Sequence, residues 1–170
     1  MKKLHVMGMM LLAMLVSTVT PVVAGTLDGA PFKIKLPGKD WILNDATAQD
    51  VGMNASLVAT LIQTNSTLRS IVIKTEMNGS AAVSYANLLA GIRESLTRPE
   101  VSGLTEDRTT FVGINAREFT YEISQNGLVM YSDTMVFISG TNGWTVDCVG
   151  PIAQKDAIKK MLAYYVKNTP

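Results

Sequence analysis

The sequence predicts a single α+β domain, in which helices flank a largely antiparallel β-sheet of about six to seven strands. Short segments rich in β-branched residues alternate apolar and polar positions, which is typical of half-buried strands. Turn residues join several of these segments at hairpin spacing. Only two stretches carry the three-to-four-residue apolar spacing of a helix, so helices are expected to pack on a mainly antiparallel sheet.

The N-terminus has the layout of a secretory signal peptide over residues 1–24. Lys2 and Lys3 precede an apolar run at residues 6–16, and small residues follow up to Ala24. The run is too short to span a bilayer, so we expect cleavage near Gly25 and a periplasmic or secreted protein without a transmembrane anchor. Cleavage also removes His5, the only histidine.

In the first half of residues 25–170, alternation predicts a strand at 32–36, which Pro37 and Gly38 end. Residues 41–43 resume the apolar pattern, and 44–54 are expected to form a loop or a short irregular helix. Segments 57–62 and 68–75 are expected to form a hairpin. A helix over 81–97, capped by Ser80 and stopped by Pro99, places these residues on one face: Tyr85, Leu88, Leu89, Ile92 and Leu96.

The second half predicts strands around 105–112, 117–124, 128–138 and 144–149. Asn126 and Gly127 are a strong signal for a two-residue hairpin turn, because both tolerate a positive φ. Residues 139–143 suit a five-residue hairpin loop. A final helix is predicted over 154–168.

Strand register supplies the one candidate site. The turn at Asn126 and Gly127 sets Glu122 opposite Tyr131, Thr120 opposite Asp133 and Glu118 opposite Met135. If Ile138 pairs with Trp144, Met135 lies opposite Asp147. One face then carries Glu118, Asp133 and Asp147, with Glu122 and Tyr131 nearby. The other face, expected to pack in the core, carries Phe119, Tyr121, Ile123, Val136, Ile138, Trp144, Val146 and Cys148.

Clustered carboxylates repel one another unless a cation or a basic side chain neutralises them. A hard, oxygen-preferring ion such as Ca²⁺, Mg²⁺ or Mn²⁺ fits Glu118, Asp133 and Asp147 as ligands. The alternatives are a solvated face, or one paired with lysines of the last helix (Lys155, Lys159 and Lys160). The carboxylates also suit the general acid/base pair of a hydrolase.

The order of several short motifs resembles the PsbP-like family, which includes the photosystem II PsbP proteins, a Ran-binding import factor and the bacterial DcrB-type envelope proteins, to which it is nearest. The motifs are Phe32-x-Ile34-x-Leu36-Pro37 followed by Trp41, the helix around Tyr85, Gly113-x-x-Ala116-x-x-Phe119-x-Tyr121, Val129-x-Tyr131, Trp144 and Tyr164-Tyr165. The resemblance implies an α/β/α sandwich, and metal binding occurs within that family. It also implies that the protein binds or assembles other molecules.

The histidine, cysteine, charged and aromatic residues exclude some classes of function and leave others open. Loss of His5 excludes histidine-based triads and zinc sites from the mature chain, and no nucleophile or phosphate-loop motif is present. The 15 basic and 14 acidic residues give no pull toward nucleic acid. Cys148 is expected to be a buried, unpaired thiol. Trp41, Tyr85, Tyr164 and Tyr165 are expected either to line an aromatic ligand pocket or to pack as core.

These observations favour a non-catalytic binding or assembly module of the bacterial envelope, whose partner is an envelope protein or a small ligand. The alternatives are a carboxylate-dependent envelope hydrolase and a chaperone for exposed apolar segments.

Overall fold

The computed structural model describes residues 27, 29–44, 49–52, 54–78 and 81–168. The predicted signal peptide at 1–24 and the predicted helix cap at Ser80 lie outside the described residues. Within them, the chain folds as an α+β structure with two helices, as the sequence predicts.

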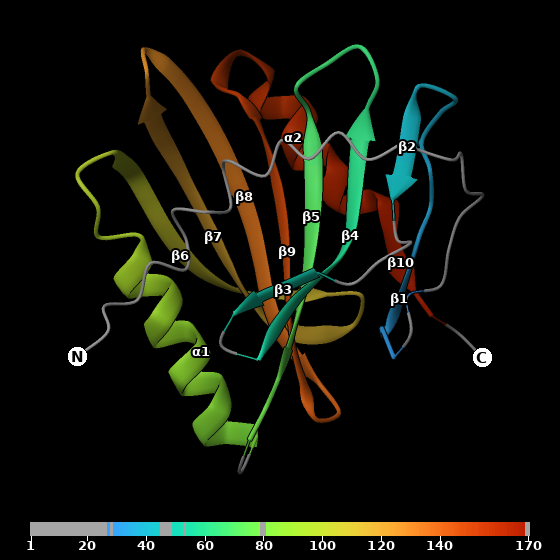
Figure 1. Cartoon of the computed structure of the whole chain (residues 1–170), viewed down its shortest axis with the longest axis vertical. Coiled ribbons are helices and arrows are strands. Elements are labelled where there is room, and N and C mark those ends of the chain that lie inside the picture. The colour runs from blue at the N-terminus through green and yellow to red at the C-terminus, as the bar shows by residue number, and fades with distance from the viewer. Residues whose placement is uncertain (1–26, 28, 45–48, 53, 79–80, 169–170) are drawn as a thin grey trace.

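An eight-stranded sheet forms the centre of the fold (Figure 1). Its strand order is β2-β4-β5-β9-β8-β7-β6, and every pair in that path is antiparallel. β3 pairs with β4 along the same edge as β2. The strands are β2 (Trp41–Asn44), β3 (Gln49–Gly52), β4 (Ala55–Gln63), β5 (Arg69–Glu76), β6 (Val101–Phe111), β7 (Ile114–Gln125), β8 (Leu128–Ser139) and β9 (Asn142–Pro151).

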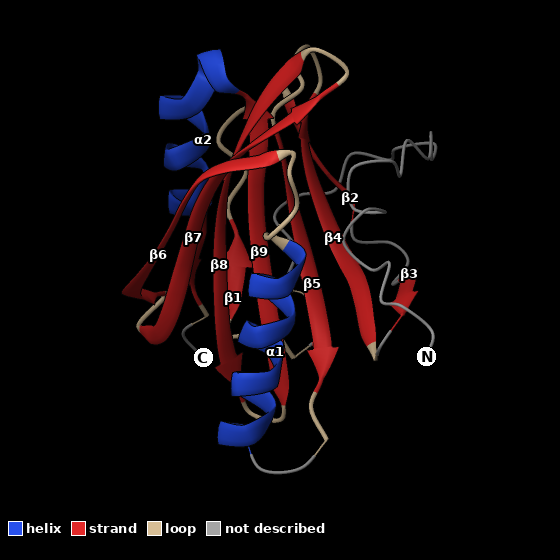
Figure 2. Ribbon diagram, turned by 90° about the vertical axis from the view of Figure 1, so that its left-hand side faces the viewer, coloured by secondary structure: helices blue, strands red, loops and turns tan. Residues whose placement is uncertain are grey.

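The two faces of this sheet are covered by different elements. Helix α1 (Ala81–Ser95) packs on one face, here called the α1 face. Helix α2 (Lys155–Met161) packs on the other, the α2 face, together with a two-stranded sheet of β1 (Phe32–Ile34) and β10 (Tyr165–Lys167). Figure 2 shows the helices on opposite sides of the sheet. This is the α/β/α sandwich that the family resemblance implied.

The larger core lies on the α2 face and is built around Phe32. Its ring meets those of Trp144 at 5.6 Å and Tyr165 at 5.4 Å, both nearly edge to face, which is a favoured aromatic geometry. Alternate strand residues reach this core, because successive side chains of a strand point to opposite faces. They include Ala59, Leu61, Val72, Tyr131, Met135, Phe137, Val146 and Cys148.

The smaller core lies beneath α1 and joins Leu89 and Leu96 to Phe119, Tyr121 and Val136. The predicted helical face is therefore confirmed in its role, because it packs on β7 and β8. Apolar side chains three and four residues apart lie on one side of a helix, and that side is buried here.

The predicted C-terminal helix is shorter than expected. α2 ends at Met161, a 3₁₀ turn follows at Leu162–Tyr164, and the chain then forms β10. β10 pairs with β1, so the main-chain groups of both short strands are hydrogen-bonded while Tyr165 packs on Phe32. Helical spacing alone did not reveal this long-range pairing.

One register prediction is confirmed and one is wrong. The turn at Asn126 and Gly127, with φ of 51° and 78°, aligns β7 with β8 as expected. In the next hairpin, however, Trp144 pairs with Phe137 rather than with Ile138. The loop holds two residues, Gly140 and Thr141, and Gly140 has a φ of 62°, which suits the first position of a type II′ turn.

Candidate functional site

The predicted three-carboxylate site is split by the one-residue difference in register. Asp133 pairs with Cys148 and lies on the α2 face, as does Glu118. Asp147 pairs with Thr134, and its side chain lies on the α1 face. The prediction that Glu118, Asp133 and Asp147 share one face is wrong, and the described residues contain no group of three or more candidate ligands placed to hold a metal.

The remaining pair, Glu118 and Asp133, lies next to α2. Asp133 is only 2% exposed, and its Oδ1 has no hydrogen-bond partner among the described residues. Burial and the neighbouring Glu118 raise the pKa of Asp133 to about 7, while Lys159 of α2 acts in the opposite direction. The pair is therefore a protonation site beneath α2, and the buried Asp133 carboxyl offers little surface to a substrate.

The other predicted surface residues do not form one binding surface. Trp41 is buried against Tyr164, with ring centroids 5.5 Å apart on the α2 face. Tyr131 is buried on the same face, with the Lys155 ammonium 4.5 Å from its ring. Glu122 lies half-buried opposite Tyr131, whereas Tyr85 belongs to α1 on the other face. The prediction that Trp41, Tyr85, Tyr164 and Tyr165 line one aromatic pocket is wrong, because Tyr85 lies on the other face of the sheet. The core alternative holds for Trp41 and Tyr165.

A groove of about 820 Å³ lies on the α1 face, where sequence reasoning placed no site. It runs between α1 and β3, over β4 and β5, and reaches β9 at its floor. The groove exists because α1 packs on β7 and β8, so the same face of β4 and β5 is left beside it. Its apolar lining includes Leu57, Ile62, Ile71, Ile73, Leu88 and Ile92.

Asp147 lies at the floor of this groove and is almost fully buried. Its Oδ1 accepts hydrogen bonds from the hydroxyls of Thr134, at 2.8 Å, and Ser132. Burial raises the pKa of Asp147, while the two hydroxyls and the Arg69 guanidinium oppose the shift. The nearby Tyr121 phenol has its pKa raised by burial and by the Asp147 charge. The floor is thus a buried polar cluster within apolar walls.

Arg69 provides the one buried donor of the groove that lacks an acceptor among the described residues. Its Nε is buried and makes no hydrogen bond, although Arg69 lines the groove. The guanidinium lies close enough to affect the pKa of Asp147, but the two side chains form no ion pair in the described part of the chain. A guanidinium has five N–H donors and no acceptor, so an oxygen from outside the protein would satisfy it.

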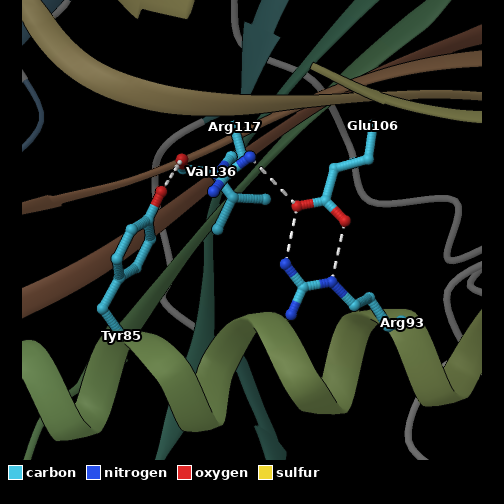
Figure 3. A network of polar contacts seen from close by, with 5 residues as sticks. All are labelled: Tyr85, Arg93, Glu106, Arg117 and Val136. Carbon is cyan, nitrogen blue, oxygen red and sulfur yellow. Dashed lines mark hydrogen bonds and ion pairs between the residues drawn. The ribbon is translucent and has the colours of Figure 1, made fainter. Parts of the chain in front are cut away.

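A polar network holds α1 in its place beside the groove (Figure 3). Arg93 donates to both carboxylate oxygens of Glu106 on β6, at 2.7 and 2.6 Å. Arg117 of β7 lies 3.5 Å from the same carboxylate, and Arg93 above all holds the pKa of Glu106 below its usual value. The hydroxyl of Tyr85 donates to the Val136 carbonyl of β8 at 3.0 Å. The polar contacts of α1 therefore reach β6 and β8, on the side away from the groove.

Two sequence signals pointed to the groove without identifying it. Leu57 lies opposite Ile73 across β4 and β5, so two neighbouring strands present apolar side chains on the α1 face. Gly91 lies inside helix α1, although glycine is unfavourable in a helix interior. A Cβ built on Gly91 meets no atom within 4 Å, because this position faces the open groove.

Comparison with solved structures identifies proteins of the same fold. LpqN of Mycobacterium tuberculosis, described as involved in cell envelope biogenesis, aligns with a TM-score of 0.54 at 15% identity, over 88% of this chain and 90% of that chain. Cyanobacterial PsbP (CyanoP) from Synechocystis sp. PCC 6803 aligns with a TM-score of 0.55 at 11% identity, over 81% of this chain and 87% of that chain.

A third structure, from Bacteroides thetaiotaomicron, has a TM-score of 0.51 at 12% identity and matches 89% of this chain but 47% of its own. No protein-family model and no curated protein matches the sequence. Among the described residues, neither helix has the length and apolar character needed to cross a bilayer.

Proposed function

From the PsbP-like fold of this chain and the groove beside α1, we propose that the protein is a non-catalytic binding module of the bacterial envelope, and that the groove holds a small, largely apolar ligand. The observation that carries the proposal is the groove itself. Its volume of about 820 Å³ falls within the range of small-molecule sites, about 300–1,000 Å³. Apolar walls with a few polar groups at one place are the usual composition of such sites.

The envelope location is supported by two independent observations. The N-terminal 24 residues have the pattern of a signal peptide. LpqN, which has the same fold, is described as involved in cell envelope biogenesis. Because fold alone is weak evidence for function, the groove and not the neighbour supports the binding role.

Binding is favoured over turnover by the chemistry that the groove contains. The hydroxyls of Ser132 and Thr134 are buried and donate to the carboxylate of Asp147, so they offer little surface to a substrate. The walls that the described residues form around them are largely apolar. Glu118 and Asp133, the pair considered for acid/base hydrolysis, lie on the other face of the sheet. A hydrolase that acts in the groove would need an acid/base pair there, and Glu118 and Asp133 lie on the opposite face.

Titration with the neutral dye Nile red tests the proposal. We expect the protein to bind the dye with increased fluorescence, and Gly91→Leu to abolish the increase by filling the groove from α1. The matched control is Ala90→Leu, because Ala90 is an exposed residue of the same helix that does not line the groove. Both variants keep a helix-forming residue in α1, so both are expected to fold.

Equal dye binding by the two variants, or no binding by the unmodified protein, would refute the proposed groove function. The chaperone alternative is separated by adding an unstructured apolar peptide. If the peptide displaces the dye and small amphiphiles do not, the groove serves apolar protein segments instead.

A further inference from the structure

The donors and charges of the groove specify what kind of ligand it takes. We infer that the ligand is an anionic amphiphile, whose acidic head group binds at Arg69 and whose apolar tail lies along β4 and β5. This inference rests on the proposed function and adds to it the chemical class of the ligand.

The hydrogen-bond donors of the groove favour a ligand with an acceptor group. Ser132 and Thr134 direct their hydroxyl protons to Oδ1 of Asp147, so their donors are already used. Arg69 remains with a buried Nε that has no acceptor in the described part of the chain. Leaving a buried donor unpaired is costly, and a carboxylate or phosphate accepts from a guanidinium in a planar, charge-assisted arrangement.

Both arginines that line the groove lie at one end of it, together with the carboxylates of Asp147 and Glu94. Arg69 starts β5 and pairs with Ile62 and Val149. Arg98 follows α1 and lies at the same end of the groove as Arg69. Its carbonyl accepts a hydrogen bond from the amide of Val101, and Val101 pairs with Ile123, two residues from Tyr121. The exposed Glu94 is on the α1 rim.

Two acidic groups of the lining lie toward the other end. Glu76 is the last residue of β5, and Asp50 pairs with Ser56, which lies opposite Lys74. Because Glu94 and Asp147 share the arginine end, the unpaired Nε of Arg69, and not the net charge, favours an anionic head group there. Glu76 and Asp50 disfavour the reverse orientation.

The apolar tail of the ligand is expected to bind along the apolar part of the groove. Ile71 and Ile73 follow Arg69 on the same face of β5, and Leu57 lies opposite Ile73 on β4. From Arg69 to Thr75 a strand rises about 20 Å at roughly 3.3 Å per residue. Leu88 and Ile92 of α1 form the opposite wall. An extended acyl chain fits a slot of this shape and lining better than a globular polar solute does.

Displacement of bound Nile red by three amphiphiles of equal tail length tests the inference, each used below its critical micelle concentration. The probes are laurate, dodecanol and dodecylamine. We expect laurate to displace the dye at a concentration at least about tenfold lower than dodecanol, because hydrogen bonds to charged groups are stronger than neutral ones. Dodecylamine is expected to be the weakest.

Substitutions of Arg69 test whether this residue causes the preference for laurate over dodecanol. In Arg69→Met the advantage of laurate over dodecanol is expected to disappear, while in Arg69→Lys part of it remains. The control is Arg108→Met, since Arg108 is exposed on β6 and does not line the groove. Circular dichroism and melting temperature establish that each variant is folded, and Arg69→Lys carries the test if Arg69→Met is unstable.

The outcomes separate this inference from the proposed function. If dodecanol displaces the dye as well as laurate does, or if Arg69→Met leaves the ratio unchanged, the head-group assignment is overturned while the groove remains a binding site. If dodecylamine binds most tightly, Asp147 and not Arg69 selects the ligand. Failure of all three probes together with absence of dye binding overturns the proposed function itself.

Discussion

Replacing Asp133 with Asn changes the pH dependence of stability in a way that the structure specifies. The pKa of Asp133 rises from 3.8 to about 7, mainly because the carboxyl is buried and secondly because Glu118 lies beside it. Between these values the folded chain keeps a proton that the unfolded chain has released, so the free energy of unfolding falls as the pH increases and levels off above about pH 7. At about 1.4 kcal/mol per pKa unit, the full effect is roughly 4 kcal/mol.

Urea unfolding of the unmodified protein and of Asp133→Asn at pH 5 and pH 8, followed by tryptophan fluorescence, measures this effect. Asn mimics the protonated carboxyl and does not titrate. From pH 5 to pH 8, the free energy of unfolding of the variant should therefore rise by roughly 2–3 kcal/mol relative to that of the unmodified protein. Glu106 titrates in both proteins and does not interact with Asp133, so its contribution cancels in the difference. Asp107→Asn, at an exposed position of β6, is the control. A stability difference between the two proteins that stays constant from pH 5 to pH 8 would refute the placement of Asp133.

Three further predictions concern the core, the thiol and the N-terminus. Phe32→Ala should lower the free energy of unfolding by about 3–5 kcal/mol in urea titrations, because Phe32 is fully buried among aromatic rings; a loss below about 1 kcal/mol would contradict this packing. Cys148 should react with a thiol reagent only after unfolding, since it is fully buried, donates to Ser70 and has its pKa raised by burial; rapid labelling of the folded protein would contradict its position. Mass spectrometry of the protein from its native envelope should give an N-terminus near Gly25, and a retained Met1 would rule out cleavage.

The fold was predictable because local signals agreed with the final structure over most of the chain. The turn at Asn126 and Gly127 fixed the longest hairpin correctly, since the required positive φ is encoded in two adjacent residues. The strand at β10 was not predictable from its own residues. Tyr165 continues the helical spacing, and only its pairing with β1 across the chain makes it extended.

The candidate site was mispredicted because β8 and β9 have no solvent-facing side over most of their length. Both strands are buried on both faces, with α1 on one side and α2 on the other. Alternation of polar and apolar residues sets the register only where one face is exposed. Polar residues such as Thr134 and Asp147 are therefore buried together, and the Gly140-Thr141 turn decides which face they occupy.

The groove itself was beyond prediction from local pattern. Ile71 and Ile73 have the alternation of ordinary core residues, and nothing in their sequence neighbourhood indicates that α1 packs on β7 and β8 instead of on β5. Its position depends on contacts such as Arg93 with Glu106, thirteen residues apart in sequence. A groove of this kind depends on how helices and strands pack in three dimensions, which local sequence patterns do not encode.

Methyl NMR spectra of the isotope-labelled protein titrated with laurate test the location of binding most directly. The account predicts that the methyl signals of Ile71, Leu88 and Ile92 shift with a single saturating curve, while those of Ile158, a buried residue of α2, stay in place. Shifts confined to the α2 face, or no saturable shift of the groove methyl groups, would contradict the claim that this protein holds a ligand between α1 and β3.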